Sequence, residues 1–307
     1  MMLSALLLCS GSATVGSAYH LTSPRKMPLI RGTGICRRKA LARLALVSST
    51  PCILPAFGAE SILEARLQEK SIAPPPYGME AAEKDIFYPS YFQGSWTAVS
   101  KTLDVQAPFG FELFTGGKSA FDSVIQKEVK GGDVLRYKAR FIAQFIGDDA
   151  GNTYVAADRE FNAKEIAKAA MGSYSVIDVP IATPNRFSCV LAPPDGSTNL
   201  ICVDIITIAR KSEPLSDNKF ACSEVVRQIV SPATRNPTPV IPLSVKEIET
   251  ISVYTKVSDN QIQCLQRTAT YLVPSQTDPI AFKKWQVSKG NSVDVRCYDV
   301  IYSRMIN

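Results

Sequence analysis

The sequence predicts an all-β protein with one or two short helices, built as an antiparallel β-barrel of about nine or ten strands. In segment 135–145, apolar and polar residues alternate, as expected of a strand with one buried face. Comparable segments recur along the chain and are separated by turn residues such as those at 147–152. Many short strands at regular spacing indicate a barrel or a sandwich. A closed barrel would also leave no edge strand exposed.

Ten segments carry the strand pattern in chain order. They are 94–105, 135–145, 153–158, 173–179, 186–192, 199–210, 218–230, 245–257, 261–273 and 292–305. One internal helix is expected, with Asn162 as its N-cap, Glu165 completing a capping box and Gly172 following its end. Residues 60–86 predict a short amphipathic helix followed by a Pro-rich linker, so the barrel domain is expected at 87–307.

The first 59 residues hold seven of the 34 Lys and Arg but none of the 28 Asp and Glu. We interpret them as three targeting segments: a signal peptide (1–18), a plastid transit peptide (19–36) and a twin-arginine thylakoid-transfer segment (37–59). Arg37 and Arg38 precede an apolar stretch and a small-residue cleavage site. We therefore expect delivery to the thylakoid lumen of a plastid (chloroplast). An ordinary secretory or mitochondrial leader is the alternative.

Removal of this leader leaves a chain of nearly balanced charge, so no nucleic-acid partner is expected. The single histidine, His20, lies in the leader, which leaves no imidazole for base catalysis or metal binding. No spacing of residues points to a catalytic, metal or cofactor site, so we expect a protein that is not an enzyme. We also expect no transmembrane segment after processing, because no apolar run reaches 18 residues.

Five cysteines follow the leader, and two of them flank the turn at 193–196. A two-residue loop would place Cys189 opposite Cys202, close enough for a disulfide. Pro194 lacks the N–H which that loop needs, so a three-residue loop is favoured. Cys189 would then face Ile201, and the two thiols would lie on opposite faces of the sheet. We predict no Cys189–Cys202 disulfide.

The first predicted strand opens with Gly94-Ser95-Trp96. A G-x-W on a first strand resembles lipocalin-type barrels, in which the Trp plugs the closed end and an Arg from a late strand stacks on it. Arg296 and Arg304 are the candidates for that arginine. The alternative is an ordinary core Trp.

Candidate ligand contacts are mainly aromatic. The Gly-rich loop 107–121 is expected to act as a lid over the barrel mouth, or else to be an ordinary surface loop with its aromatics tucked under. Arg159 is a candidate polar contact beside Asp158. In the structural alternative Asn162 caps the helix, while Asp158 or Arg159 pairs with a neighbouring strand. The hypothetical ligand-binding residues are Trp96, Phe109, Phe111, Phe114, Tyr137, Phe141 and Arg159.

Two stretches resemble an uncharacterised family of cyanobacterial and plastid proteins, domain-of-unknown-function family 6816. Residues 86–96 (IFYPSYFQGSW) resemble its Y-P-x-W-F-x-G-T-W opening, and 157–167 resemble its A-D-R-x-F-N-x-x-x-I-A stretch. The chain departs at Tyr91, where the family pattern has Trp. The resemblance implies a lipocalin-like, thylakoid-associated protein and implies no reaction.

Two functions are compatible with these observations. The first is a non-enzymatic lumenal binder of a small apolar ligand such as a pigment, an isoprenoid or a lipid. The alternative is an auxiliary or assembly protein that binds a photosynthetic complex through its surface. A hollow apolar interior would favour the first function, and a filled barrel would favour the second.

Overall fold

The computed structural model describes residues 61–69, 73–75, 85–145, 153–171, 175–193, 199–233, 242–275 and 278–305. These residues belong to one compact unit and carry its described core. We therefore expect the chain from residue 60 onward to fold on its own. The targeting segments within 1–59 lie outside the described residues.

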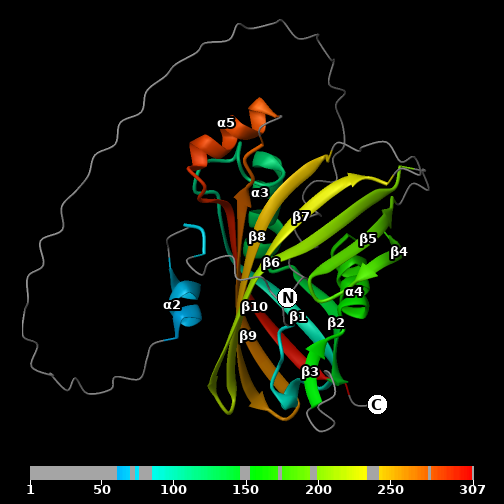
Figure 1. Cartoon of the computed structure of the whole chain (residues 1–307). Coiled ribbons are helices and arrows are strands. Elements are labelled where there is room, and N and C mark those ends of the chain that lie inside the picture. The colour runs from blue at the N-terminus through cyan, green and yellow to red at the C-terminus, as the bar shows by residue number, and fades with distance from the viewer. Residues whose placement is uncertain are drawn as a thin grey trace, which may run out of the picture. The chain divides into compact units, whose positions relative to one another are not determined.

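Ten antiparallel strands form one sheet in the order β3-β2-β1-β10-β9-β8-β7-β6-β5-β4 (Figure 1). The predicted all-β class and the number of strands are confirmed. The strands are β1 (Gly94–Gln106), β2 (Val134–Phe145), β3 (Thr153–Ala157), β4 (Ser175–Ala182), β5 (Arg186–Ala192), β6 (Ile201–Ser216), β7 (Lys219–Pro232), β8 (Ser244–Ser258), β9 (Gln261–Leu272) and β10 (Ser292–Arg304).

The sheet curls into a half-barrel whose ladder of backbone hydrogen bonds does not close. Within the described residues β3 and β4 form its two edges, and no pairing joins them. Helix α4 (Arg159–Met171) connects these edge strands and packs against β2 and β4 (Figure 1). A helix therefore lies at the seam where a closed barrel would have a further strand pairing.

Helix α4 begins four residues earlier than the sequence indicated. The Asp158 carboxylate accepts a hydrogen bond from the Phe161 N–H at 3.1 Å, and the Asp158 carbonyl accepts one from the Asn162 N–H at 2.9 Å. Asp158 is thus the N-cap, and the prediction that Asn162 fills this role was wrong. Asn162 instead clamps β2, since its side chain bonds both the N–H and the C=O of Arg140.

The predicted N-terminal helix is confirmed as α2 (Ile62–Gln68). Part of the predicted loop 107–121 is instead helical. This region contains α3 (Gly117–Val124), which runs into the π-helix η3 (Ile125–Lys130). The 3-10 turn η2 (Ser90–Phe92) and helix α5 (Pro279–Ser288) were not anticipated either. Helix α5 has a clear start signal, because Asp278 caps it and Pro279 occupies its first turn.

The pairing of β5 with β6 differs from both registers considered from the sequence. Cys189 faces Val203, and Cys202 faces Val190, so the predicted pairing of Cys189 with Ile201 was wrong. The conclusion about the thiols still holds. Cys189 belongs to the buried core, whereas Cys202 is half-buried and lies beside Ser188, so the two thiols are on opposite faces of the sheet. The turn residues 194–198 lie outside the described part.

The inner face of the half-barrel changes in character along the strands. On β9 the inward positions run from Ile262 and Cys264 to Gln266, Thr268 and Thr270. The first two belong to the main core, and the last three are polar. We call the two ends of the interior the Trp96 end and the Arg296 end. Among the described residues, no helix is both long and apolar enough to cross a membrane.

Candidate binding site inside the half-barrel

The Trp96 end is closed by a plug. Trp96 is 1% exposed, and its indole N–H donates a 2.7 Å hydrogen bond to the Phe92 carbonyl. The Arg304 guanidinium lies 4.3 Å from the centre of the indole ring. The predicted stacking of a late-strand arginine on Trp96 is therefore confirmed, with Arg304 as the partner.

Gly94 is part of the same plug. Its φ of +123° lies in a region that side chains with a Cβ rarely adopt, and a Cβ there would lie 2.9 Å from Nη1 of Arg304. The glycine and the tryptophan of the G-x-W motif thus serve one purpose. The first makes room for the guanidinium, and the second supplies the ring on which it stacks.

Aromatic side chains fill the interior beside the plug. Tyr88 packs against Phe92 and Phe141 with ring centres 5.0 and 4.8 Å away, and Phe92 meets Tyr254 at 5.1 Å. Tyr137 is also buried, and this burial raises its pKa to about 12. Three residues predicted to contact ligand, namely Trp96, Tyr137 and Phe141, therefore lie in a packed aromatic core.

Beyond this core, a row of polar side chains crosses five neighbouring strands. It consists of directly cross-strand partners, which we call the inner polar band: Arg296, Thr268, Thr250, Glu224 and Arg210, on β10, β9, β8, β7 and β6. The first four residues of the band are each no more than 6% exposed. The side chain of the fifth, Arg210, is 5% exposed. A buried polar group is costly unless it is hydrogen-bonded, so such a row inside a barrel requires partners.

Glu224 is the charged centre of one half of the band. Its Oε1 accepts a 2.7 Å hydrogen bond from Nε of Arg210 and lies 3.8 Å from Nη1 of Arg159, which in turn pairs with Asp85. Burial alone would raise the pKa of Glu224, but Arg159 and Arg210 outweigh it and lower that pKa. Glu224 is therefore held as a carboxylate, and Arg159 is an ion-paired member of this group.

Several buried polar atoms in or near the band have no hydrogen-bond partner among the described residues. They include Oε2 of Glu224, the second oxygen of this carboxylate, and the hydroxyl of Thr270. Thr270 is the inward neighbour of Thr268 and lies opposite Asp294. Leaving a buried polar group unpaired costs about 1–3 kcal/mol, so both atoms suit a hydrogen-bonding guest such as a hydroxyl group or a water molecule.

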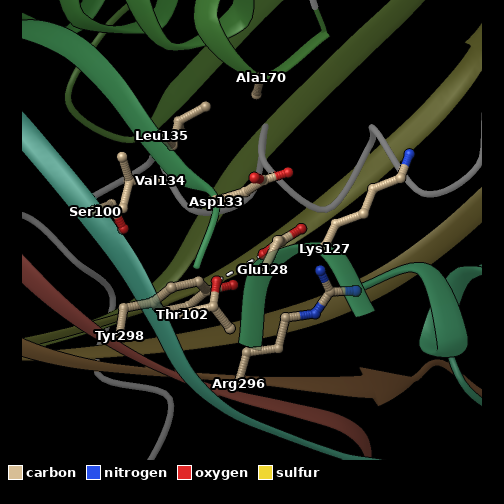
Figure 2. Close-up of a pocket in the computed structure, with 10 residues that line it drawn as sticks. All are labelled: Ser100, Thr102, Lys127, Glu128, Asp133, Val134, Leu135, Ala170, Arg296 and Tyr298. Atoms are coloured by element: carbon tan, nitrogen blue, oxygen red, sulfur yellow. Dashed lines mark hydrogen bonds between the residues drawn. The ribbon is translucent and has the colours of Figure 1, made fainter. Parts of the chain in front are cut away.

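A cavity of about 220 Å3 lies at the Arg296 end, between β1, β10, β2, η3 and α4. Its apolar side includes Leu135 and Ala170, and its polar side includes Thr102, Glu128 and Arg296 (Figure 2). Further lining residues are Ser100, Lys127, Asp133, Val134 and Tyr298. Arg296 is also the first member of the inner polar band, so the cavity and the band meet at this residue.

The polar side of the cavity is held rigidly. The Thr102 hydroxyl donates to Glu128 at 2.6 Å, which ties β1 to the π-helix (Figure 2). Arg296 donates two hydrogen bonds of 2.9 Å to Asp294. Burial alone would lower the pKa of Arg296, but the adjacent Asp294 raises it, so this guanidinium stays charged. Burial raises the pKa of Tyr298 to about 12, so its hydroxyl stays protonated.

The aromatic residues of the predicted lid do lie at this end. Phe114 is buried, packs edge-on against Phe121 at 5.3 Å, and has the Arg296 guanidinium 5.2 Å from its ring centre. Phe111 is 40% exposed and contacts Phe121 at 4.8 Å, while Phe109 is half-buried. Arg296 thus stacks on an aromatic residue of this loop, whereas Arg304 stacks on the plug.

The remaining predicted structural residues secure α4 across the seam. Asp158 pairs with Arg140 on β2 at 2.6 Å, and the Arg140 guanidinium lies 4.3 Å from the Phe161 ring centre. Arg159 reaches Glu224 on β7. The predicted pairing of Asp158 or Arg159 with a neighbouring strand is confirmed for both residues.

The inner polar band itself was missed in the sequence, apart from Arg296. A signal for it existed in β9, where alternate residues change from Ile262 and Cys264 to Gln266, Thr268 and Thr270. Strand alternation separates apolar from polar positions, and polar positions are ordinarily assigned to the solvent face. Only the register shows that these polar residues continue the inner face.

The described residues offer little reactive chemistry. They contain no cluster of three or more His, Cys, Asp or Glu side chains that could hold a metal ion. Burial raises the pKa of Cys222 well above its ordinary value and that of Cys264 to about 12, so both thiols stay protonated. A protonated thiol is a poor nucleophile.

These features define an antiparallel half-barrel with one plugged aromatic end and one polar-lined cavity. The chain belongs to the family described as Domain of unknown function (DUF6816), whose model matches residues 80–294. The match begins shortly before η2 and ends within β10, so it includes Trp96, the seam helix and four of the five members of the inner polar band, while Arg296 and Arg304 lie beyond it. No curated protein and no solved structure matches the chain.

Proposed function

We propose that this protein is a non-enzymatic binding protein whose half-barrel holds part of a small amphipathic molecule at the Arg296 end. The carrying observations are two unpartnered buried atoms on the inner face, Oε2 of Glu224 and the Thr270 hydroxyl, together with a cavity of about 220 Å3 that shares Arg296 with the inner polar band. A ligand hydroxyl would serve either atom, because it donates to a carboxylate and both donates to and accepts from a threonine.

The cavity lining favours a ligand with two unlike parts. Leu135, Val134 and Ala170 offer apolar surface, while Thr102, Glu128 and Arg296 offer hydrogen-bonding groups. Ligand pockets commonly measure about 300–1,000 Å3, so this cavity suits a fragment such as one ring or a short chain better than a whole pigment. A hydroxylated isoprenoid ring or a lipid head with its first methylenes is the chemical class that we propose.

A role in binding rather than catalysis is supported by the charge pairing. Arg296 is neutralised by Asp294, and Glu224 is flanked by Arg159 and Arg210. The buried thiols and phenols have raised pKa values and stay protonated at neutral pH. A general base titrates near the working pH, and none of these groups does so.

The proposal can be tested with two probes that differ in one hydroxyl group, 3-hydroxy-β-ionone and β-ionone. The chain from residue 60 onward is titrated with each probe and followed by NMR. The hydroxylated probe should bind several-fold more tightly and should shift the amide signals of Thr268, Thr270 and Leu135. Equal affinities, or shifts confined to the outer face, would contradict the proposal.

Three variants sharpen the test. Thr270→Val preserves shape and removes the hydroxyl, so the preference for the hydroxylated probe should shrink while β-ionone binding stays unchanged. Leu135→Trp fills the apolar side of the cavity and should abolish binding of both probes. Thr97→Val, on an outward position of β1, serves as the matched hydroxyl deletion and should leave the affinity for both probes unchanged.

The filled aromatic core favours a second candidate function, that of an auxiliary or assembly protein that binds a photosynthetic complex through its surface. Trp96, Phe92 and Tyr254 occupy the plugged end, and the cavity described above lies at the Arg296 end. If neither probe binds, this second function is the one to pursue. For both functions we propose the thylakoid lumen as the setting, on the strength of the targeting segments.

A further inference from the structure

Helix α5 turns apolar side chains towards solvent. At 100° per residue, Ile280 and Val287 fall on one side of the helix, with Lys283 and Lys284 on either flank of that side. Ser288 is buried and Trp285 is half-buried, which marks a different side of the helix as the packed one. Ile280 is 66% exposed and Val287 is 59% exposed. Helix propensity does not explain these branched residues at exposed positions.

The helix is also purely basic. Residues 279–288 contain Lys283 and Lys284 and no acid, and Lys289 follows at the C-cap. None of these three lysines has an acidic partner within 4.0 Å among the described residues. The only nearby acid of the segment, Asp278, is engaged in capping the helix.

Other exposed apolar side chains lie at the same end of the half-barrel. Among the described residues, the three most exposed large hydrophobic side chains are Ile280, Leu243 and Val287. Leu243 immediately precedes β8. The first residues of β8 pair with the last residues of β9, and α5 follows β9 in the chain. Phe111, with Lys118 5.4 Å from its ring centre, contacts Phe121 of α3. Helix α3 lies at the same end as α5 (Figure 1).

We propose that this end of the molecule docks on the surface of a lipid bilayer that contains anionic lipids, with α5 lying in the interface. The apolar side of α5 enters the boundary between headgroups and acyl chains, and its lysines meet the lipid phosphates. Lysine stems are long enough to follow apolar surface while their ammonium groups stay in the headgroup layer. The proposal is independent of what the cavity binds.

The pattern of charge argues for a bilayer over a protein partner. Branched apolar residues flanked by lysines, with a Phe282–Trp285 stack of 5.9 Å between centres at the side, combine the residue types that occupy a membrane interface. Helix α5 has 10 residues, too few to span a bilayer but sufficient to lie on one.

The test uses the chain from residue 60 onward and vesicles of phosphatidylcholine with or without phosphatidylglycerol. The protein should sediment with the vesicles that contain phosphatidylglycerol and be released by high salt. Bromine-labelled lipid should quench the fluorescence of Trp285. Since Trp96 and Trp285 are the only two tryptophans and Trp96 is buried at the other end, Trp285→Phe should remove the quenching.

Two double variants separate the contribution of the apolar side chains to vesicle binding from that of the lysines. Ile280→Ser with Val287→Ser should lower the bound fraction several-fold, and Lys283→Glu with Lys284→Glu should do so and remove the salt dependence. Val257→Ser is the apolar control, since Val257 is 57% exposed near the plugged end. Lys101→Glu with Lys138→Glu, on exposed strand positions, is the charge control.

Both controls should bind as the unaltered chain does. The proposal is overturned if no vesicle binding occurs, if the controls lose binding equally, or if Trp285 is not quenched. It is also overturned if light scattering shows a dimer that the α5 variants dissociate while vesicles are not bound, because α5 would then join two copies of this chain.

Discussion

Arg304 lies 4.3 Å from the Trp96 ring centre and also donates 2.8 Å hydrogen bonds to the carbonyls of Tyr91 and Gln93. One side chain from the last strand therefore stacks on the first strand and fixes the turn η2 that precedes it. This contact joins segments more than 200 residues apart in the chain.

Replacement of the plug should destabilise the whole domain. Trp96→Ala removes a 1%-exposed side chain from the core and should lower the free energy of unfolding by about 3–5 kcal/mol. Urea denaturation followed by circular dichroism measures this difference. Trp285→Ala is the control and should cost much less, because Trp285 is only half-buried. Equal losses in the two variants would contradict a structural role of the plug.

Gly94 should tolerate no side chain, for two separate reasons. Gly94→Ala places a Cβ at a φ of +123° and 2.9 Å from Arg304 Nη1, so the chain must shift or the stack on Trp96 must loosen. We expect a loss of about 1–3 kcal/mol from the backbone conformation alone. In Gly94→Ala with Arg304→Ala, the steric part of the loss should disappear, so the two losses should not add.

Helix α2 should depend on one buried ion pair. Arg66 is 3% exposed and donates 2.7 and 2.9 Å hydrogen bonds to Glu249 on β8. Arg66→Ala leaves this buried carboxylate with fewer partners and should cost about 3–5 kcal/mol. Glu64→Gln, which disrupts only the half-exposed pair with Lys219, should cost less than about 1 kcal/mol. Thermal unfolding compares the two, and similar losses would contradict this assignment.

Glu224 should make the fold sensitive to acid. Its pKa in the folded protein is lower than the ordinary value of 4.5, so its charge stabilises the fold above that value. This stability is lost as the pH falls through 4.5 and then through the lower pKa of the folded state. Glu224→Gln should be less stable at neutral pH and should lose less further stability on acidification. Glu247→Gln, in a more exposed pair with Arg227, should retain the unaltered acid dependence.

The leader prediction can be tested in cells. A fluorescent protein fused to residues 1–59 should reach the thylakoid lumen. Replacing both Arg37 and Arg38 by Lys should stop it before the lumen, because the twin-arginine route reads the arginine pair. Retention in the cytosol, or lumen delivery without the pair, would contradict the targeting scheme.

Strand positions were predictable because a half-buried strand has one apolar and one polar face, so its residues alternate between apolar and polar along the sequence. The alternation in 186–192 marked β5 with the bounds that the structure has, and the G-x-W motif indicated the stacked arginine. Closure of the ladder was not predictable, since the absence of pairing between β3 and β4 depends on where α4 packs. The inner polar band was hidden for a different reason, because threonine and glutamine on an inner face look like solvent-facing residues until the register is known.

The seam occupied by α4 has a mechanical consequence. A closed barrel can widen only by breaking backbone hydrogen bonds, whereas this half-barrel is bridged at its seam by side chains: Asn162 and Asp158 hold Arg140 on one side, and Arg159 holds Glu224 on the other. Moving α4 outward would enlarge the interior and leave every ladder bond of the ten strands intact. At the seam, the width of the interior is thus held by side chains of α4, including the core residues Ile166 and Ala167, instead of by the backbone ladder of the sheet.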